Sequence, residues 1–184
     1  MLDFQNISVH YGLQDVLTNV SFRVNKGERV GVVGPNGSGK STLFIVNDDP
    51  ALAAEAEADG VHVGQDDMSP SEVRAKFPQL KVVGLSTHNL DQVRASWKQP
   101  INYIGVGPVY ATPTKDIPDP TLGPEMAGRM IAAARVPAVA IGGINAETLP
   151  PVLAAGARNF AVVRAVCQSQ DPYSAIRALM ETHA

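Results

Sequence analysis

A glycine-rich segment near the amino terminus carries the first candidate chemistry. Residues 34–42 read Gly-Pro-Asn-Gly-Ser-Gly-Lys-Ser-Thr and match the pattern G-x-x-x-x-G-K-[ST]. In this pattern the glycines let backbone N–H groups point at phosphate oxygens, the lysine adds a positive charge, and the next hydroxyl can ligate Mg²⁺. A helix starting near Gly39 would aim its positive end at the same anion. The segment therefore predicts a phosphate or nucleotide site formed by Gly34, Asn36, Gly37, Gly39, Lys40, Ser41 and Thr42.

A second set of candidates follows the short apolar runs in the rest of the chain. Polar or glycine residues come after six such runs: Asn47 and Asp48; Gln65 and Asp67; Ser86; Thr112, Thr114 and Lys115; Gly142 and Gly143; and Arg164. In a parallel α/β barrel these positions lie at the carboxyl ends of strands, where active sites form. One polar residue there could be a helix cap, but six in succession are not explained by caps alone. Two carboxylates from neighbouring strand ends suit Mg²⁺, and Lys115 and Arg164 suit phosphate groups.

Alternating strand and helix patterns would position these residues. Strands are predicted at 44–46, 60–63, 81–85, 103–106, 138–141 and 160–163, and helices near 50–58, 69–77, 89–98, 124–134, 146–155 and 172–182. The stretch Ser69-Pro70-Ser71-Glu72 predicts a capped helix start with proline at its first position. Upstream, residues 2–9 and 20–24 alternate as an antiparallel pair, and residues 29–33 form a third strand pattern. The proline-rich segment 108–124 predicts a long ordered loop.

Composition narrows the classes of function. The chain has 184 residues, a formal net charge of −3 and one cysteine, Cys167. This charge argues against a nucleic-acid partner bound through a basic face, and a single thiol excludes an internal disulfide framework. The apolar runs are shorter than the roughly 18–20 residues of a membrane span, and the amino terminus does not read as a secretory signal. We therefore expect a cytoplasmic protein without a membrane partner.

Residues 2–43 resemble the opening of an ABC-type ATPase domain. The similarity comprises Tyr11, where that family stacks adenine, the strand 17–24, the turn 25–28 and the phosphate loop 34–42. The family's signature helix, glutamine loop, switch histidine and Walker B acidic pair are missing from the sequence. The resemblance implies an ATP or phosphate site that includes Tyr11, but without the acid and partner motifs that hydrolysis requires.

Residues 44–178 resemble thiamine-phosphate synthase, a family of (βα)8 barrels. The similarity rests on the stretches 44–48, 60–67, 84–88, 105–115 and 140–144. That family joins a hydroxymethylpyrimidine diphosphate to a thiazole phosphate and releases pyrophosphate. The resemblance implies that Asp48 and Asp67 hold Mg²⁺ on the diphosphate. It also implies that Asn47, Gln65, Ser86 and Lys115 contact the pyrimidine diphosphate, with Ser86 and Lys115 in catalytic roles, and that Thr112, Thr114, Gly143, Val163 and Arg164 hold the thiazole or product phosphate.

The chain departs from that family in two respects. Many members carry serine where Arg164 stands, although arginine still suits a phosphate. The family's first two βα units, whose second strand supplies a glutamine, an arginine and a lysine to the diphosphate, are missing here. No protein nucleophile is needed for the family's reaction, so Cys167 is expected to be an ordinary buried residue.

The two resemblances meet near residues 43 and 44, which predicts domains at 1–43 and 44–184. Only about ten residues separate the strand ending near Val33 from the one beginning near Phe44, and a parallel crossover with its helix needs roughly 10–12. Either the helix is cut short, or residues 29–33 pair differently, or the front end is loosely docked. The expected fold is α/β, a partial or rebuilt (βα)8 TIM-type barrel with an N-terminal antiparallel β pair and a P-loop segment.

Four functions fit these patterns. The first is a synthase-like transferase that acts on phosphorylated small molecules with Mg²⁺. The second is an ATP- or phosphate-binding module that uses Lys40 and Ser41. The third is a thiazole-tautomerase-like relative on the same barrel, against which the intact Asp48, Asp67 and Lys115 argue. The fourth is a folded hybrid, or chimera, without turnover.

Overall fold

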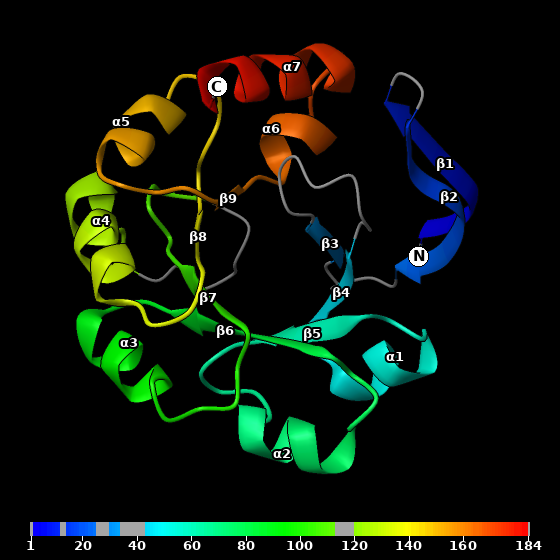
Figure 1. The fold of residues 1–184 in the computed structure, drawn as a ribbon. Coiled ribbons are helices and arrows are strands. Elements are labelled where there is room, and N and C mark those ends of the chain that lie inside the picture. Colours follow the sequence, from blue (N-terminus) through cyan, green and yellow to red (C-terminus); the bar gives the residue numbers. More distant parts are fainter. Residues whose placement is uncertain (1, 12–13, 25–29, 34–42, 113–119, 184) are drawn as a thin grey trace. The chain divides into compact units, whose positions relative to one another are not determined.

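The computed structural model describes residues 2–11, 14–24, 30–33, 43–112 and 120–183 (Figure 1). The chain divides into two compact units, one of residues 1–63 with 67–83 and one of residues 64–66 with 84–184. No helix within the described ranges is long and apolar enough to cross a membrane.

The first unit contains two sheets of different character. Strand β1 (Leu2–Tyr11) pairs antiparallel with β2 (Gln14–Val24), in a register that places Leu2 opposite Val24 and Phe4 opposite Phe22. Strands β3 (Val30–Val33), β4 (Leu43–Asn47) and β5 (Gly60–Val63) form a second ladder, in which β4 and β5 run parallel. Helices α1 (Pro50–Glu55) and α2 (Pro70–Lys76) follow β4 and β5. The predicted alternation of parallel strands and helices begins at β4.

Strand β3 resolves the spacing problem at the junction. It pairs antiparallel with β4, from Val30 opposite Val46 to Val33 opposite Leu43. An antiparallel pair can be closed by a short connection, whereas a parallel pair needs a crossover of a dozen or more residues. Strand β3 therefore pairs differently from a phosphate-loop strand, which was one of the three expected solutions. The helix expected near Gly39 lies outside the described residues.

Helices α1 and α2 each start at a side-chain cap. Asp49 accepts hydrogen bonds from the backbone N–H groups of Ala51 and Leu52, at 2.9 and 3.0 Å. At α2, Ser69 and Glu72 form the predicted reciprocal capping box, with Pro70 at the first helical position. The hydrogen bond from the Ser69 side chain lowers the pKa of the Glu72 carboxyl. The capping prediction is confirmed, because the residues that decide a helix start lie within one turn of it.

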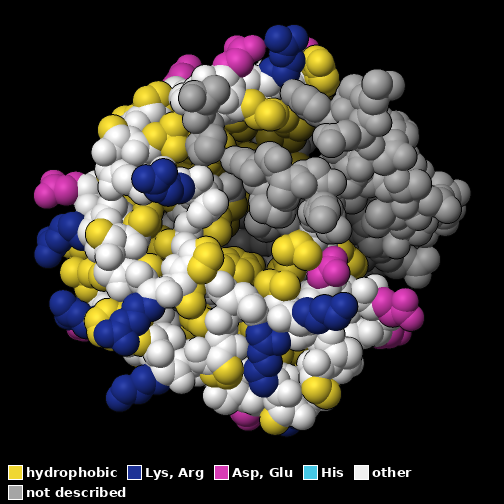
Figure 2. Space-filling model, viewed as in Figure 1, with side chains coloured by type: hydrophobic (Ala, Val, Ile, Leu, Met, Phe, Trp, Pro, Cys, Tyr) yellow, Lys and Arg dark blue, Asp and Glu magenta, His cyan; other side chains and the backbone are white. Residues whose placement is uncertain are grey.

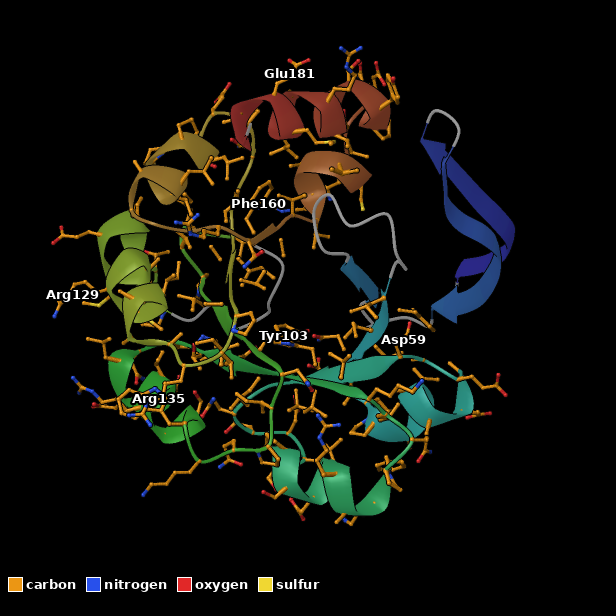
Figure 3. The ribbon with its side chains drawn as sticks, in the orientation of Figure 1. Asp59, Tyr103, Arg129, Arg135, Phe160 and Glu181 are labelled. Atoms are coloured by element: carbon orange, nitrogen blue, oxygen red, sulfur yellow. The ribbon has the colours of Figure 1, made fainter. Side chains whose placement is uncertain are left out.

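Asp59 ties the strand starts of the first unit together. Its carboxylate accepts the Phe44 N–H at 2.9 Å, and its backbone carbonyl accepts the N–H groups of Lys81 and Val82 at 3.0 and 3.1 Å (Figure 3 labels Asp59). Gly60 lies directly against the Val82 backbone, so that any Cβ at residue 60 would collide with the Val82 carbonyl oxygen. These contacts align the starts of β4 and β5 with the first residues of β6 (Val82–Thr87).

The second unit continues the strand and helix alternation. Its strand order is β6, β7 (Tyr103–Val106), β8 (Ala138–Ile141) and β9 (Phe160–Ala161), all parallel. The helices are α3 (Leu90–Ser96), α4 (Gly123–Ala133), α5 (Leu149–Ala154), α6 (Arg164–Cys167) and α7 (Pro172–His183). One core joins strands and helices, with Ile104, Val106, Met130 and Leu149 fully buried. Helix α6 is an element that the periodicity of the sequence did not predict.

Two side chains of the second unit lie where local pattern could not place them. Cys167, expected to be buried, is exposed at the end of α6, because this four-residue helix buries none of its residues.

Trp97 is 40% exposed and donates its indole N–H to the Ala133 carbonyl at 3.2 Å. The Arg135 guanidinium lies 3.8 Å from the centre of the Trp97 ring, which joins the ends of α3 and α4 by a cation–π contact. Figure 2 shows basic side chains, in dark blue, gathered over these two helices, and Figure 3 labels Arg129 and Arg135 among them.

Candidate functional site

The two candidate metal ligands belong to the first unit and follow adjacent parallel strands. Asn47 ends β4 opposite His62 of β5, and the Asp48 backbone N–H donates to the His62 carbonyl at 2.8 Å. Asp67 comes four residues after Val63, the last residue of β5. Both carboxylates are exposed, and Asn47 is half-buried. The carboxyl ends of neighbouring parallel strands lie at the same end of the sheet, so Asp48 and Asp67 both follow the strands at that end.

Asp48 and Asp49 are consecutive but differ in backbone conformation and in the role of their carboxylates. Asp49 is extended and uses its carboxylate to cap α1, as described above. Asp48 adopts a left-handed backbone with φ of 69°, which is uncommon for a residue other than glycine. The left-handed residue turns the chain between β4 and the capped start of α1. Asp49 therefore caps the helix, whereas the exposed carboxylate of Asp48 takes no part in the cap.

His62 lies beside Asn47 in the paired strands. Its register position beside Asn47 and the bond from Asp48 place it at the same sheet edge as the candidate ligands. A single histidine inside an apolar strand carries no spacing signal by itself. Only the pairing of β4 with β5 shows which residue it adjoins.

Gln65 and Ser86 are brought together in the second unit. The Gln65 side-chain amide donates to the Ser86 backbone carbonyl, which holds Gln65 at the carboxyl end of β6. Beside Ser86, the buried Thr87 hydroxyl donates to the Gly105 carbonyl at 2.8 Å. The His88 Nδ1 lies 2.6 Å from the Gly107 carbonyl oxygen, so this nitrogen carries a proton and donates. Side chains therefore tie the ends of β6 and β7 together around Ser86.

Thr112, Gly143 and Arg164 form a second group of candidate residues in the same unit. The Arg164 guanidinium donates to the Thr112 hydroxyl at 3.4 Å, although the two residues lie 52 positions apart in the chain. Gly143 lies against the backbone that leads to Thr112, since a Cβ there would come within 2.9 Å of the Ala111 carbonyl oxygen. Val163, half-exposed, precedes Arg164 at the start of α6. A guanidinium, a hydroxyl and a glycine turn are groups that bind a phosphate well.

The remaining candidates lie outside the described residues. They are Thr114 and Lys115 in the loop after β7, and Gly34, Asn36, Gly37, Gly39, Lys40, Ser41 and Thr42 in the phosphate-loop motif. For Tyr11, the structure describes the backbone only, as the last residue of β1 opposite Gln14. Their predicted roles stay predictions.

The carboxylate pair fits a magnesium ion by its chemistry. Mg²⁺ prefers oxygen ligands and is commonly held by one or two carboxylates, with water and substrate phosphate completing its octahedron. Asp48 and Asp67 offer such oxygens at one sheet edge. Across the described ranges, no group of three or more His, Cys, Asp or Glu side chains gathers as a metal cage. Two carboxylates would fill at most part of such an octahedron and would leave its other positions to water and a ligand.

Comparisons with known proteins show which family the chain belongs to. The family model described as thiamine monophosphate synthase matches residues 34–166, beginning ten residues before the junction expected at residue 44. The chain is 47% identical over 141 residues to the thiamine-phosphate synthase of Synechococcus sp. (strain WH7803), which covers 77% of this chain and 40% of that protein. It is 42% identical over 139 residues to the thiamine-phosphate synthase of Staphylococcus saprophyticus, covering 75% of this chain and 65% of that protein.

A solved structure is similar as well. The thiamine phosphate pyrophosphorylase of Pyrococcus furiosus superposes with a TM-score of 0.69 at 30% identity, over 77% of this chain and 67% of that one. The chain therefore spans about two fifths to two thirds of the length of these relatives.

Proposed function

Because the chain belongs to the thiamine monophosphate synthase family, we propose that it joins a hydroxymethylpyrimidine diphosphate to a thiazole phosphate and releases pyrophosphate. The observation that carries the proposal is the order of the candidate residues along the sheet. Each parallel strand from β4 to β9 is followed, at or just beyond its carboxyl end, by one of the family's motif residues. Active sites of (βα)8 barrels form at this end of their strands.

Thr112, Gly143 and Arg164, all in the second unit, bind the thiazole phosphate in this proposal. Thr112 and Arg164 are already in contact, and the Gly143 turn lies against the same backbone. The guanidinium of Arg164 adds a charge-assisted hydrogen bond to the phosphate, which serine at that position would not supply. Val163, next to Arg164, lies beside the ring of the thiazole in this proposal.

Six of the candidate residues are assigned to the pyrimidine diphosphate in this proposal. Asp48 and Asp67 would hold Mg²⁺ on its phosphates, and such an ion would supply positive charge against the charge of the departing pyrophosphate. Asn47 orients the diphosphate from the end of β4, and Lys115 adds a positive charge to the leaving group. Gln65 and Ser86 contact the pyrimidine from the end of β6, with Ser86 held in place by the Thr87 and His88 hydrogen bonds.

The residues promote the reaction by orientation and charge. As the bond between the pyrimidine methylene carbon and the phosphate oxygen breaks, pyrophosphate leaves with the electron pair and a resonance-stabilised pyrimidine cation remains. The thiazole nitrogen donates its lone pair to that carbon and forms the new C–N bond. Arg164 and Thr112 hold the thiazole phosphate so that its nitrogen faces the reacting carbon, which replaces a bimolecular encounter by a positioned one. No protein side chain forms a covalent intermediate.

A reconstitution assay tests this function. The purified chain is incubated with pyrimidine diphosphate, thiazole phosphate and Mg²⁺, and both thiamine phosphate and pyrophosphate are measured. We expect product from the unsubstituted chain, loss of product on chelation of Mg²⁺, and loss in Asp67→Ala. The matched control is Asp66→Ala, which removes the neighbouring exposed carboxylate and should retain activity. Absence of product from the unsubstituted chain, or equal loss in both variants, would overturn the proposal.

We infer a second candidate function for the amino-terminal part, the binding of ATP or phosphate at residues 34–42. Its support is the intact motif directly after β3, together with Tyr11 in β1. On this view residues 1–43 and 44–184 descend from two families and the chain is a chimera. The short distance to β4 argues against the long helix that usually follows such a motif. Calorimetric titration with ATP and with inorganic phosphate tests the inference: binding lost in Lys40→Ala supports it, and no binding by the unsubstituted chain refutes it.

A further inference from the structure

A pair of left-handed glycines forms the turn that follows β8. Gly142 has φ of 101° and Gly143 has φ of 63°, conformations that glycine adopts without steric cost. Glycine also has the greatest freedom to leave such a conformation, because the unconstrained chain offers it more alternatives than any other residue. A turn built from two glycines therefore needs contacts from elsewhere in the fold if it is to present one arrangement to a ligand.

The segment after β7 supplies the first of these contacts. Val109 donates its backbone N–H to the Ile141 carbonyl at 2.8 Å, and Tyr110 donates its own to the Gly142 carbonyl at 3.0 Å. The segment after β7 and the turn after β8 are also closely packed. A Cβ on Gly142 would come within 2.6 Å of the Pro108 Cα, and one on Gly143 within 2.7 Å of the Tyr110 Cβ. The turn after β8 and the segment after β7 are thus one packed layer.

The Tyr110 side chain extends this layer to the start of α5. Its hydroxyl donates to the Thr148 backbone carbonyl at 3.0 Å. From the other side, the Thr148 hydroxyl lies 3.1 Å from the Gly143 carbonyl and accepts the Asn145 N–H at 2.9 Å. Asn145 in turn accepts the Thr148 N–H through its side-chain oxygen at 2.9 Å. Gly143 is therefore held between Tyr110 and Thr148, and the hydroxyl of Tyr110 joins the two sides.

We propose that Tyr110 is a positioning residue that preorganises the Gly142–Gly143 turn, and with it Thr112, for the phosphate of the thiazole substrate. The inference rests on the proposed function for the identity of that substrate. Thr112 follows Tyr110 by two residues and contacts Arg164, so a shift of the Tyr110 segment moves the hydroxyl that faces the guanidinium. Tyr110 itself touches neither reacting atom. Because Tyr110 already holds the turn in one conformation, less conformational entropy is lost when the phosphate binds.

The test compares Tyr110→Phe with Tyr103→Phe. Both substitutions remove a phenolic hydroxyl from the same unit, but Tyr103 starts β7 whereas Tyr110 lies beyond its carboxyl end. Loss of one net hydrogen bond corresponds to about fivefold in an equilibrium constant. We expect Tyr110→Phe to raise KM for thiazole phosphate about fivefold while KM for the pyrimidine diphosphate changes less than about twofold. Tyr103→Phe should leave the ratio of the two KM values unchanged.

Hydrogen exchange provides a second measurement that does not depend on turnover. The amides of residues 142–145 should exchange faster in Tyr110→Phe and at the original rate in Tyr103→Phe. A merely structural role predicts the opposite pattern, a lower melting temperature with both KM values and the local exchange unchanged. That result would overturn the proposal.

Failure of the proposed function is distinguishable from failure of this inference. If the unsubstituted chain makes no thiamine phosphate, calorimetric titration with thiazole phosphate replaces KM, and weaker binding in Tyr110→Phe still supports the positioning role. If the unsubstituted chain is active and Tyr110→Phe shows the original KM values, the positioning role alone is wrong. If the unsubstituted chain does not bind thiazole phosphate, both proposals are wrong.

Discussion

Replacing Gly143 by alanine separates the backbone and packing requirements of the turn after β8. A matched control exists in Gly123, at the start of α4, because its φ of 69° is nearly that of Gly143 at 63°. Nothing lies within 4 Å of a Cβ on Gly123, whereas a Cβ on Gly143 would meet the Tyr110 Cβ at 2.7 Å. The two substitutions therefore share the conformational term and differ in the contact.

The size of each effect follows from these geometries. A left-handed backbone costs an alanine about 1–2 kcal/mol, and this applies to Gly123→Ala and Gly143→Ala alike. Alanine also has fewer conformations than glycine in the unfolded state, which favours folding of the variant. This contribution is the same for the two substitutions. The contact at Gly143 is about 0.7 Å shorter than the 3.4 Å at which ordinary contacts begin. Forcing an extra carbon into such a site costs about 1–3 kcal/mol more.

Urea and thermal unfolding measure the difference directly. We expect Gly143→Ala to be less stable than Gly123→Ala by about 1–3 kcal/mol, or roughly 2–4 °C of melting temperature for each kcal/mol in a chain of this size. Gly143→Ala should also weaken the binding of thiazole phosphate, which Gly123→Ala should leave intact. Equal stabilities of the two variants would refute the reasoning, because they would show that the segment after β7 does not press on the turn.

Two further predictions concern the first unit and the start of β7. Asp49→Ala removes the cap of α1 and should lower the free energy of unfolding by about 1 kcal/mol in urea titrations. Asp48→Asn keeps a residue that tolerates the left-handed backbone, so it should change stability by less than about 0.5 kcal/mol. The same substitution should abolish Mg²⁺-dependent turnover. Equal destabilisation by Asp49→Ala and Asp48→Asn would contradict the assignment of Asp49 to the helix cap and of Asp48 to the metal. Burial raises the pKa of Tyr103, so the folded chain keeps this phenol neutral where the unfolded chain ionises it. Stability should therefore fall as pH rises above about 10, less steeply in Tyr103→Phe, and parallel pH profiles of unfolding would show the inference to be wrong.

Local features of the fold could be predicted from the sequence because their causes lie close together in the chain. The capping box at Ser69 and Glu72 needs residues within one turn, and the helices α1 to α5 and α7 follow apolar spacings that a short window contains. The candidate residues after each strand were found in the same way, since a polar residue after an apolar run is visible in the sequence. Helix α6 was missed because four residues carry no period.

Pairing across long stretches of chain was decided only by the tertiary structure. The antiparallel direction of β3 against β4 depends on which edge of β4 is open, and the spacing of residues 29–44 left three solutions. The contact of Arg164 with Thr112 and the bond from Tyr110 to Thr148 join residues 52 and 38 positions apart. Such contacts depend on where whole strands and helices lie, which local spacing does not encode.

The sequence by itself thus determined the order of strands and helices apart from α6, and which residues follow the strands. The tertiary structure decided which of them meet. It assigned Asp49 to a helix cap and left Asp48 exposed, placed His62 beside Asn47, and brought Cys167 to the surface. The physical reason is that a residue's type sets what it can bond to, while its partner is set by the packing of elements that are distant in the chain.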